Sequence, residues 1–278
     1  MTPKAPYAEV IGDPVAHSKS PLIHRYWLEH LDLDGDYRRS RVEPDELGSF
    51  LAKRRSDPDW RGCNVTIPYK ETILPFLDEI DGDARRIGAV NIVIRRNGRL
   101  IGFNSDVDGI ANALRGFDIP GSSVLMIGAG GAARAAAAFL GSRGVRRLTL
   151  LVRDPGKAEG LRALAPEADL QIHRLAEADF TQEVPNLVIN ASPLGMAGGP
   201  SMPAGVLDQL KRYTPSAMFF DMVYSPPETD FLATAQSGGS DVADGLTMLV
   251  GQAARAFASF FGEAPPEADG KLRDLLLR

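Results

Sequence analysis

The sequence contains very little cysteine, since Cys63 is the only one among 278 residues. A single cysteine excludes an internal disulfide and any zinc site built from several thiolates. The four histidines are also sparse, and no two of them stand four residues apart around a glutamate, as in a helical zinc protease. We therefore predict no metal site. We expect Cys63, which lies in a strand-like stretch, to be a buried and inert thiol.

Long apolar runs and an excess of positive charge are missing as well. No stretch of about 18 uninterrupted apolar residues occurs, and residues 1–12 lack the long apolar segment of a signal peptide. The formal net charge is −5 and the Lys and Arg residues are scattered, so no basic patch marks a site for nucleic acid or anionic lipid. We expect no membrane and no nucleic-acid partner. The expected protein is cytoplasmic, a monomer or homodimer, and acts on a small-molecule substrate.

The remaining composition is that of an ordinary globular protein, with 44% hydrophobic and 24% charged residues. The length exceeds one average domain of about 150 residues, which favours two. Residues 1–106 mix strand-like and helical stretches and are predicted to form an α/β substrate-binding and catalytic domain. We expect its strands at 7–12, 37–42, 63–67, 89–96 and 100–104, and its helices near 20–31, 44–56 and 79–86.

Residues 107–243 carry a regular alternation of strand and helix signals. In order, these are a Pro120-Gly121 turn, a strand at 123–127, a glycine-rich turn, an alanine-rich helix, and strands at 146–152, 186–190 and 218–223, with a helix near 204–212. Such an order is typical of a parallel sheet covered on both faces. We predict a Rossmann-type, doubly wound dinucleotide-binding domain.

Residues 244–278 have a different pattern of apolar residues from the segment before them. The stretch GLTMLVGQAARAFASFFG has a broad apolar stripe at helical spacing, and Pro265-Pro266 follows it. A helix this apolar needs a surface to cover. We predict C-terminal helices that pack back on the substrate domain, which makes the whole chain a two-lobed α/β protein.

A glycine-rich turn links the strand at 123–127 to the alanine-rich helix. Its pattern, Gly128-x-Gly130-x-x-Ala133, occupies the strand–turn–helix context that a dinucleotide fingerprint requires. Gly128 would allow the tight turn, Gly130 the close approach of a pyrophosphate, and Ala133 the packing of helix on strand. The helix N-terminus adds free N–H groups that favour an anion. We therefore predict a cofactor-binding turn, made of Gly128, Ala129, Gly130, Gly131 and Ala132.

The end of the next strand distinguishes NADP from NAD. An acidic residue there binds the ribose 2′-OH of NAD, whereas an arginine accepts the 2′-phosphate of NADP. The strand ends in Val152-Arg153-Asp154, and Lys157 follows. Two cations near a dianionic phosphate outweigh one carboxylate, so Arg153 and Lys157 favour NADP, while Asp154 keeps NAD open.

Eight polar motifs of the chain resemble the shikimate dehydrogenase family. In the order of the sequence they are GDPVAHSKSPLIH, NVTIPYK, IGAVN, GFNSD, GAGGAAR, INASPLGM, DMVYSP and DGLTMLVGQAA. Their spacing is similar to that of the family, and the resemblance covers the chain from about residue 8 to residue 268. The resemblance implies a reversible, NADP-dependent reduction of 3-dehydroshikimate to shikimate in the biosynthesis of aromatic amino acids through chorismate.

The resemblance also implies roles for individual residues. Lys70 and Asp106 would form the catalytic pair, although Asp108 adds a second carboxylate nearby. Residues that would bind the substrate are Ser18, Ser20, Asn64, Thr66, Asn91, Tyr224 and Gln252. Further residues on the cofactor side would be Asn190, Ser192, Met222, Gly245 and Met248. Neutral hydrogen-bonding side chains suit a small carboxylate with three hydroxyls, because a wrong analogue would leave them unpaired.

Three functions remain open from the sequence. The first is shikimate dehydrogenase, and the second is an NAD-dependent quinate/shikimate dehydrogenase, which Asp154 motivates. The third is a catalytically silent relative that binds a nucleotide and regulates a partner, which would have no need of both Lys70 and Asp106. Residue types alone do not pair Lys70 with a carboxylate, because the two need only meet in space.

Overall fold

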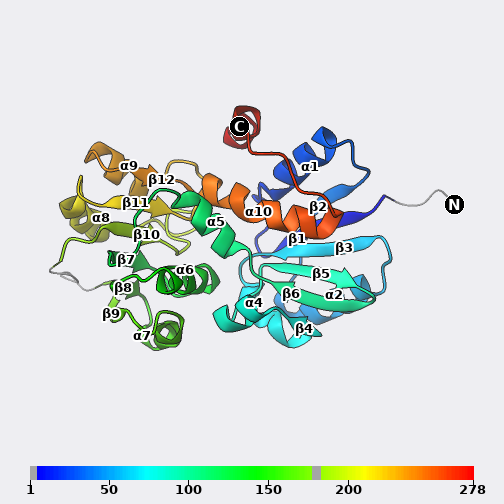
Figure 1. Ribbon diagram of the computed structural model, residues 1–278, viewed down its shortest axis with the longest axis horizontal. Coiled ribbons are helices and arrows are strands. Elements are labelled where there is room, and N and C mark those ends of the chain that lie inside the picture. The colour runs from blue at the N-terminus through cyan, green and yellow to red at the C-terminus, as the bar shows by residue number, and fades with distance from the viewer. Residues whose placement is uncertain (1–4, 177–182) are drawn as a thin grey trace. The chain divides into compact units, whose positions relative to one another are not determined.

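The computed structural model describes residues 5–176 and 183–278, and it divides the chain into two compact units (Figure 1). The first unit consists of Met1–Asp108 and Val250–Arg278, and the second of Gly109–Leu249. Helices α5 (Asp106–Ala113) and α10 (Gly245–Phe261) each continue from one unit into the other. The C-terminal residues therefore belong to the same unit as the N-terminal ones.

In its described residues the first unit contains one six-stranded sheet, of order β2-β1-β3-β5-β6-β4. Its strands are β1 (Tyr7–Gly12), β2 (Asp36–Arg41), β3 (Trp60–Val65), β4 (Glu79–Ile80), β5 (Ile92–Arg96) and β6 (Arg99–Phe103). Strand β1 is parallel to β2 and β3, and β5 is antiparallel to β3 and β6. The carboxyl end of β3 and the amino end of β5 therefore meet at one edge, where polar residues of both segments are brought together.

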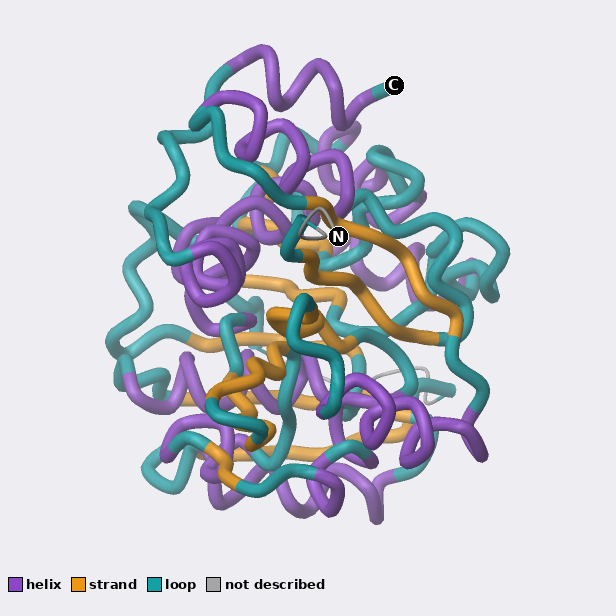
Figure 2. Tube along the Cα trace, turned by 90° about the vertical axis from the view of Figure 1, so that its right-hand side faces the viewer, coloured by secondary structure: helices purple, strands orange, loops and turns teal. Residues whose placement is uncertain are grey.

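Helices flank this sheet, as the trace in Figure 2 shows. They are α1 (Ser20–His30), the 3₁₀ turns Pro44–Glu46 and Leu74–Phe76, α2 (Leu47–Arg55), α3 (Tyr69–Thr72), α4 (Gly82–Ile87) and α11 (Gly270–Leu277). One core cluster packs Leu47 and Leu51 of α2 with Trp60 and Val93 of the sheet, and it includes the buried Cys63. Another packs Ala8, Val10 and Ile92 against Ala256 and Phe260 of α10. Burying each large apolar side chain stabilises the fold by roughly 1.5–3 kcal/mol.

The described part of the second unit also contains a six-stranded sheet, of order β12-β11-β10-β7-β8-β9, with every pairing parallel. Its strands are β7 (Ser123–Ile127), β8 (Arg147–Val152), β9 (Asp169–Arg174), β10 (Leu187–Asn190), β11 (Met218–Asp221) and β12 (Val242–Ala243). From β7 the chain adds strands on one side, and from β10 it adds them on the other. The sheet is doubly wound, and its topological switch point lies between β7 and β10.

The helices of the second unit cover its sheet from both sides. They are α6 (Gly131–Ser142), α7 (Pro155–Ala158), the 3₁₀ segments Glu159–Leu164 and Lys211–Tyr213, α8 (Ala204–Leu210) and α9 (Asp230–Ser237). Figure 1 shows α8 and α9 on the opposite side of the strands from α6. The run of alanines in α6 is buried, which lets the helix lie close to the strands. This arrangement is the Rossmann-type fold that the alternation of signals predicts.

Several local predictions were wrong. The segment 79–86 is not one helix, because Glu79 and Ile80 pair with β6, and α4 begins only after Asp81, whose carboxylate accepts a hydrogen bond from the Asp83 N–H at 3.2 Å. The strand expected at 63–67 ends at Val65, and α3 begins at Tyr69. Strand β9 was not predicted, since it is an edge strand with only one fully buried residue and carries no apolar run.

None of the described helices has both the length and the apolar character needed to cross a membrane. Among the same residues, no three His, Cys, Asp or Glu side chains are grouped in a way that could hold a metal ion.

Candidate active site

Lys70 and Asp106 face each other in the first unit. The Lys70 Nζ donates to the Asp106 Oδ2 at 2.5 Å, and the two side chains are only 17% and 4% exposed. Lys70 lies in the short helix α3, whose carbonyl at Lys70 accepts the Val90 N–H at 2.7 Å, and Asp106 is the first residue of α5. The neighbouring Tyr69 is buried and donates its hydroxyl to the Val42 carbonyl, which anchors α3 to the core. The lysine is thus held beside a carboxylate instead of extending into solvent.

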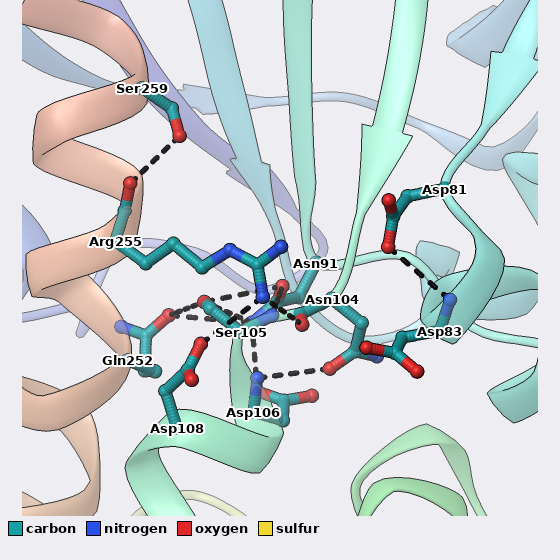
Figure 3. A network of polar contacts seen from close by, with 10 residues as sticks. All are labelled: Asp81, Asp83, Asn91, Asn104, Ser105, Asp106, Asp108, Gln252, Arg255 and Ser259. Carbon is teal, nitrogen blue, oxygen red and sulfur yellow. Dashed lines mark hydrogen bonds and ion pairs between the residues drawn. The ribbon is translucent and has the colours of Figure 1, made fainter. Parts of the chain in front are cut away.

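Asn91 is the centre of a buried polar network, hereafter the Asn91 network, which includes Asp106 of this pair (Figure 3). Its Nδ2 donates to the Asp106 Oδ1 at 2.9 Å, to the Ser105 Oγ at 3.2 Å and to the Gln252 Oε1 at 3.4 Å. Its Oδ1 accepts the Ser105 N–H at 2.7 Å. Both carboxylate oxygens of Asp106 therefore accept a hydrogen bond, one from Lys70 and the other from Asn91. Gln252 comes from α10, so the C-terminal segment completes the network.

Asn104 and the two nearby acidic residues have distinct environments. The Asn104 Oδ1 accepts the Asp106 N–H at 2.9 Å, and its Nδ2 donates to the Ala89 carbonyl at 2.9 Å, so it fixes the start of α5. Asp108 is exposed and faces the Arg255 guanidinium at 3.4 Å (Figure 3). Of the two carboxylates, Asp106 is the one paired with Lys70.

The other predicted substrate residues of the first unit lie on neighbouring elements. The Asn64 Nδ2 donates to the Asn91 carbonyl at 3.3 Å, which links β3 to the Asn91 network. Ser18 and Ser20 are buried at the start of α1 with their hydroxyl oxygens 3.3 Å apart. Thr66 is half-buried and donates its backbone N–H to the Ile11 carbonyl at 3.0 Å. No hydrogen bond among the described residues joins the two serines to Asn64 or Asn91.

The glycine-rich turn of the second unit lies at the switch point of its sheet. Gly128 has φ +119°, and a Cβ there would lie 2.7 Å from the Ala191 carbonyl oxygen, so the turn after β7 touches the turn after β10. Gly130 is the N-cap of α6, and a Cβ on it would have no neighbour within 4 Å. Open doubly wound sheets bind nucleotides at this crevice, with the pyrophosphate at the helix N-terminus. The residues present therefore fit a dinucleotide.

Arg153, Asp154 and Lys157 follow β8 and are exposed. The Asp154 Oδ1 accepts the Gly156 N–H at 3.1 Å and so caps α7. The Lys157 N–H donates to the Asp154 carbonyl at 3.2 Å, but neither the Arg153 nor the Lys157 side chain makes a hydrogen bond or ion pair among the described residues. The Asp154 carboxylate is hydrogen-bonded within its own loop, while the Arg153 and Lys157 side chains are available to bind a phosphate.

Asn190 and Asp221 hold together the segments that follow β10 and β11. Both are fully buried, and the Asn190 Nδ2 donates to the Asp221 Oδ1 and to the Leu194 carbonyl, each at 2.9 Å. The Asn190 Oδ1 accepts the Ser192 hydroxyl at 2.7 Å. Asp221 also accepts the Thr229 hydroxyl at 2.6 Å and the Val223 N–H at 2.9 Å. One carboxylate thus organises two loops at the carboxyl edge of the sheet.

The remaining residues predicted on the cofactor or substrate side lie at the same edge. Met222 follows β11 and donates its N–H to the Asn190 carbonyl at 3.0 Å. Gly245 begins α10 against the same segment, where a Cβ would lie 2.8 Å from the Met222 carbonyl oxygen. Met248 is buried one turn further along α10, and Tyr224 is half-buried after β11.

Asp221 should make the stability of the second unit depend on pH. Burial raises its pKa from 3.8 to about 6, against the opposing effect of three hydrogen-bond donors. Between these values the folded state binds more protons than the unfolded state, so stability falls as the pH rises through this window, by about 3 kcal/mol in total. Asp221→Asn, which keeps the shape of the side chain, should remove the contribution of Asp221 to the pH dependence of unfolding followed by far-UV circular dichroism. Asp208→Asn, at an exposed carboxylate of α8, is the matched control and should behave as wild type.

Sequence reasoning missed several residues of these networks. Asn104 and Ser105 stand inside the GFNSD motif, and Asp221 stands inside DMVYSP, but none was given a role. Tyr37, which contacts Asn64 through its hydroxyl, belongs to no quoted motif. A polar residue at the last position of a buried strand was the available signal for Asp221. For Tyr37 there was none, because the contact crosses between strands.

The first unit is an α/β unit with a buried Lys–Asp pair, and the second is a doubly wound unit with a glycine fingerprint. This combination is typical of dinucleotide-dependent dehydrogenases. Residues 10–93 match the shikimate dehydrogenase substrate binding domain, and residues 245–269 match the shikimate 5′-dehydrogenase C-terminal domain. A shikimate dehydrogenase (NADP⁺) of Sphingopyxis alaskensis is 46% identical over 98% of this chain and 97% of its own. The chain belongs to the shikimate dehydrogenase family.

Solved structures agree with this assignment and show the breadth of the fold. The shikimate 5-dehydrogenase of Thermus thermophilus, solved with NADP(H) and shikimate, has a TM-score of 0.82 and 33% identity, covering 98% of each chain. The ligand-free 5-ketofructose reductase of a Gluconobacter strain has a TM-score of 0.83 and 29% identity, also covering 98% of each chain. A similar fold therefore serves an enzyme of a different name, and the substrate must be argued from side chains.

Proposed function

We propose that this protein catalyses the reversible, NADPH-dependent reduction of 3-dehydroshikimate to shikimate, the reaction named for its relatives. The observation that carries the proposal is the Lys70–Asp106 pair at 2.5 Å, held by Asn91 in a buried polar network. A relative that only sensed a nucleotide would have no need of this pair. The family membership and the match to an enzyme solved with NADP(H) and shikimate support the same reaction.

The polar groups of the first unit suit the substrate. Ser18 and Ser20 would hold its carboxylate by hydrogen bonds, and Asn64, Thr66, Asn91 and Gln252 would bind its hydroxyls. These residues are neutral donors and acceptors, and all but Thr66 are buried. Buried neutral groups discriminate strongly, because an analogue without the matching hydroxyl leaves them unpaired. Tyr224 would line the substrate side.

Lys70 supplies the proton of the reduction. When bound, the reduced nicotinamide supplies a hydride to the substrate carbonyl carbon. The Lys70 ammonium donates a proton to the carbonyl oxygen as negative charge develops there, and so stabilises the transition state. Asp106 orients the ammonium through one oxygen and accepts a hydrogen bond from a substrate hydroxyl. In the oxidative direction the same lysine takes the proton back.

The second unit suits NADP. The N-terminus of α6 and the turn Gly128–Ala132 would hold the pyrophosphate, and Arg153 with Lys157 would hold the 2′-phosphate. Asp154 opposes this less than its charge suggests, because it already accepts the Gly156 N–H. Asn190, Ser192, Met222, Gly245 and Met248 would lie on the nicotinamide side.

A substrate and cofactor comparison tests the proposal. The rate of cofactor reduction is measured with shikimate or quinate, each with NADP⁺ or NAD⁺, and cofactor oxidation is measured with 5-ketofructose. We expect the highest kcat/KM for shikimate with NADP⁺. A clear preference for quinate with NAD⁺ would establish the alternative dehydrogenase instead. Reduction of 5-ketofructose without oxidation of shikimate would refute the proposed substrate.

A further inference from the structure

Tyr37 stands next to a predicted substrate residue but belongs to none of the family motifs. It is fully buried on β2, and its hydroxyl donates to the Asn64 Oδ1 at 2.6 Å. The other end of the Asn64 amide donates to the Asn91 carbonyl at 3.3 Å. A carbonyl oxygen can only accept, so the Asn64 nitrogen must lie on the Asn91 side and the Asn64 oxygen on the Tyr37 side. Together the two contacts fix the orientation of the amide.

The sheet makes room for this contact. In the strand register Tyr37 pairs with Ala8 of β1, and Ala8 pairs with Gly62 of β3, so all three residues lie in one row on the same face. Asn64 is two residues beyond Gly62 and therefore points to the same side. Because Ala8 and Gly62 are small, the Tyr37 side chain can cross over β1 and reach β3. A Cβ on Gly62 would already lie 2.7 Å from the Phe260 ring.

The Tyr37 ring is held in place by an aromatic cluster. It stacks on the His24 imidazole with ring centroids 4.0 Å apart and planes 3° from parallel. Phe260 lies 6.3 Å from Tyr37 between ring centroids, and Phe257 lies 5.8 Å from His24. His24 is itself fully buried. A ring packed on this cluster keeps its hydroxyl at a constant position, which preorganises the group that it contacts.

We propose that Tyr37 is a positioning residue that sets the specificity of the substrate site through Asn64. A side-chain amide has two N–H groups, and one of those on Asn64 is directed at the Asn91 carbonyl. The fixed orientation presents the second N–H to a hydroxyl of the substrate that does not react. Without the Tyr37 hydroxyl, the amide can rotate and present its oxygen instead. This inference rests on the proposed function, because it assigns a role within the same site.

The test compares Tyr37→Phe with Tyr7→Phe. Tyr7 is a buried tyrosine of the adjacent strand β1, and its hydroxyl donates to Asp57 at 2.7 Å, so its variant makes the same chemical change away from the Asn91 network. Removing one hydrogen bond that orients the amide should raise the KM for shikimate roughly 5- to 20-fold. Because the ground state and the transition state are affected alike, kcat should change less than about twofold. Tyr7→Phe should leave the KM for shikimate unchanged, and neither variant should change the KM for NADP⁺.

Two further measurements distinguish positioning from general structural damage. Shikimate has two hydroxyls that do not react, and two analogues can be compared with it, each lacking one of these hydroxyls. Tyr37→Phe should reduce the preference for shikimate over one of the two analogues. In an Asn64→Ala background, adding Tyr37→Phe should produce no further increase in KM. If Tyr37→Phe misfolds, His24→Leu, which retains the Tyr37 hydroxyl but removes the ring under it, should raise the same KM by a smaller factor.

The outcomes separate this inference from the proposed function. A wild-type enzyme that does not oxidise shikimate refutes both. A wild-type enzyme that does, together with an unchanged KM and analogue preference in Tyr37→Phe, refutes the positioning role alone. Additive effects of Tyr37→Phe and Asn64→Ala would also refute it, because they would show that Tyr37 acts independently of Asn64.

Discussion

Lys70→Ala should lower kcat/KM for shikimate by about 10³-fold or more while cofactor affinity stays nearly constant. The loss has two sources, the proton donor and the positive charge beside the developing alkoxide. Cofactor affinity is expected to persist because the groups that fit a dinucleotide lie in the second unit, whereas Lys70 lies in the first. Steady-state kinetics and a titration of NADPH fluorescence measure the two quantities separately.

The same substitution leaves the Asp106 carboxylate buried without its cation. Removing one partner of a buried ion pair commonly costs about 3 kcal/mol of stability, so lost activity could reflect unfolding. Lys70→Met combined with Asp106→Asn removes both charges and should recover the stability but not the activity. Lys53→Ala, at an exposed lysine of α2, is the control for the loss of a positive charge. Activity within tenfold of wild type in Lys70→Ala would mean that Lys70 is not the proton donor.

The class of fold follows from patterns that are local in the sequence. The run at 123–127, the glycine turn and the alanine helix define one β-α-β unit because strand, turn and helix each have their own spacing of apolar residues. Local patterns fail to predict a strand where its formation depends on pairing with a neighbouring strand. Glu79 and Ile80 form a strand only because β6 lies beside them, and β9 exists because the edge of β8 accepts it.

In the candidate site, too, some residues could be predicted from the sequence and others only from the structure. Residue types and the family resemblance selected Lys70, Asp106, Asn91 and Gln252, which the structure brings into one network. The motif position favoured Asp106 over Asp108, and in the structure Asp106 is the carboxylate that faces the lysine, whereas Asp108 faces Arg255. Tyr37 could not have been found, since its role depends on the register of three strands and on two small residues between them.

The stability of the first unit should fall as the pH drops from about 6.5 toward about 3, because of His24. Neither ring nitrogen of this buried imidazole has a hydrogen-bond partner among the described residues, and the rings of Trp27, Tyr37, Phe257 and Phe260 surround it. Burial lowers its pKa from 6.5 to about 3. The unfolded chain therefore binds a proton that the folded unit does not. This contribution to stability is complete above about pH 6.5 and is lost on acidification, up to about 5 kcal/mol.

His24→Leu should remove this acid sensitivity. Leucine fills the site without a titratable group, so the unfolding midpoints in denaturant should vary less between about pH 4 and about pH 7 than they do in wild type. Both tryptophans, Trp27 and Trp60, are buried in the first unit, so their fluorescence reports this unit alone. His30→Leu, an exposed position on the same helix, should keep the wild-type dependence.

The two buried groups act in opposite directions in separate units. On acidification toward about pH 4 the first unit loses stability through His24, and the second gains stability through Asp221, whose folded-state pKa is about 6. In wild type, tryptophan fluorescence should therefore shift to lower denaturant concentration on acidification more strongly than far-UV circular dichroism, which reports both units. Coincident shifts of the two signals at every pH would show that the units unfold together. An unaltered fluorescence response in His24→Leu would show that another group controls the acid sensitivity.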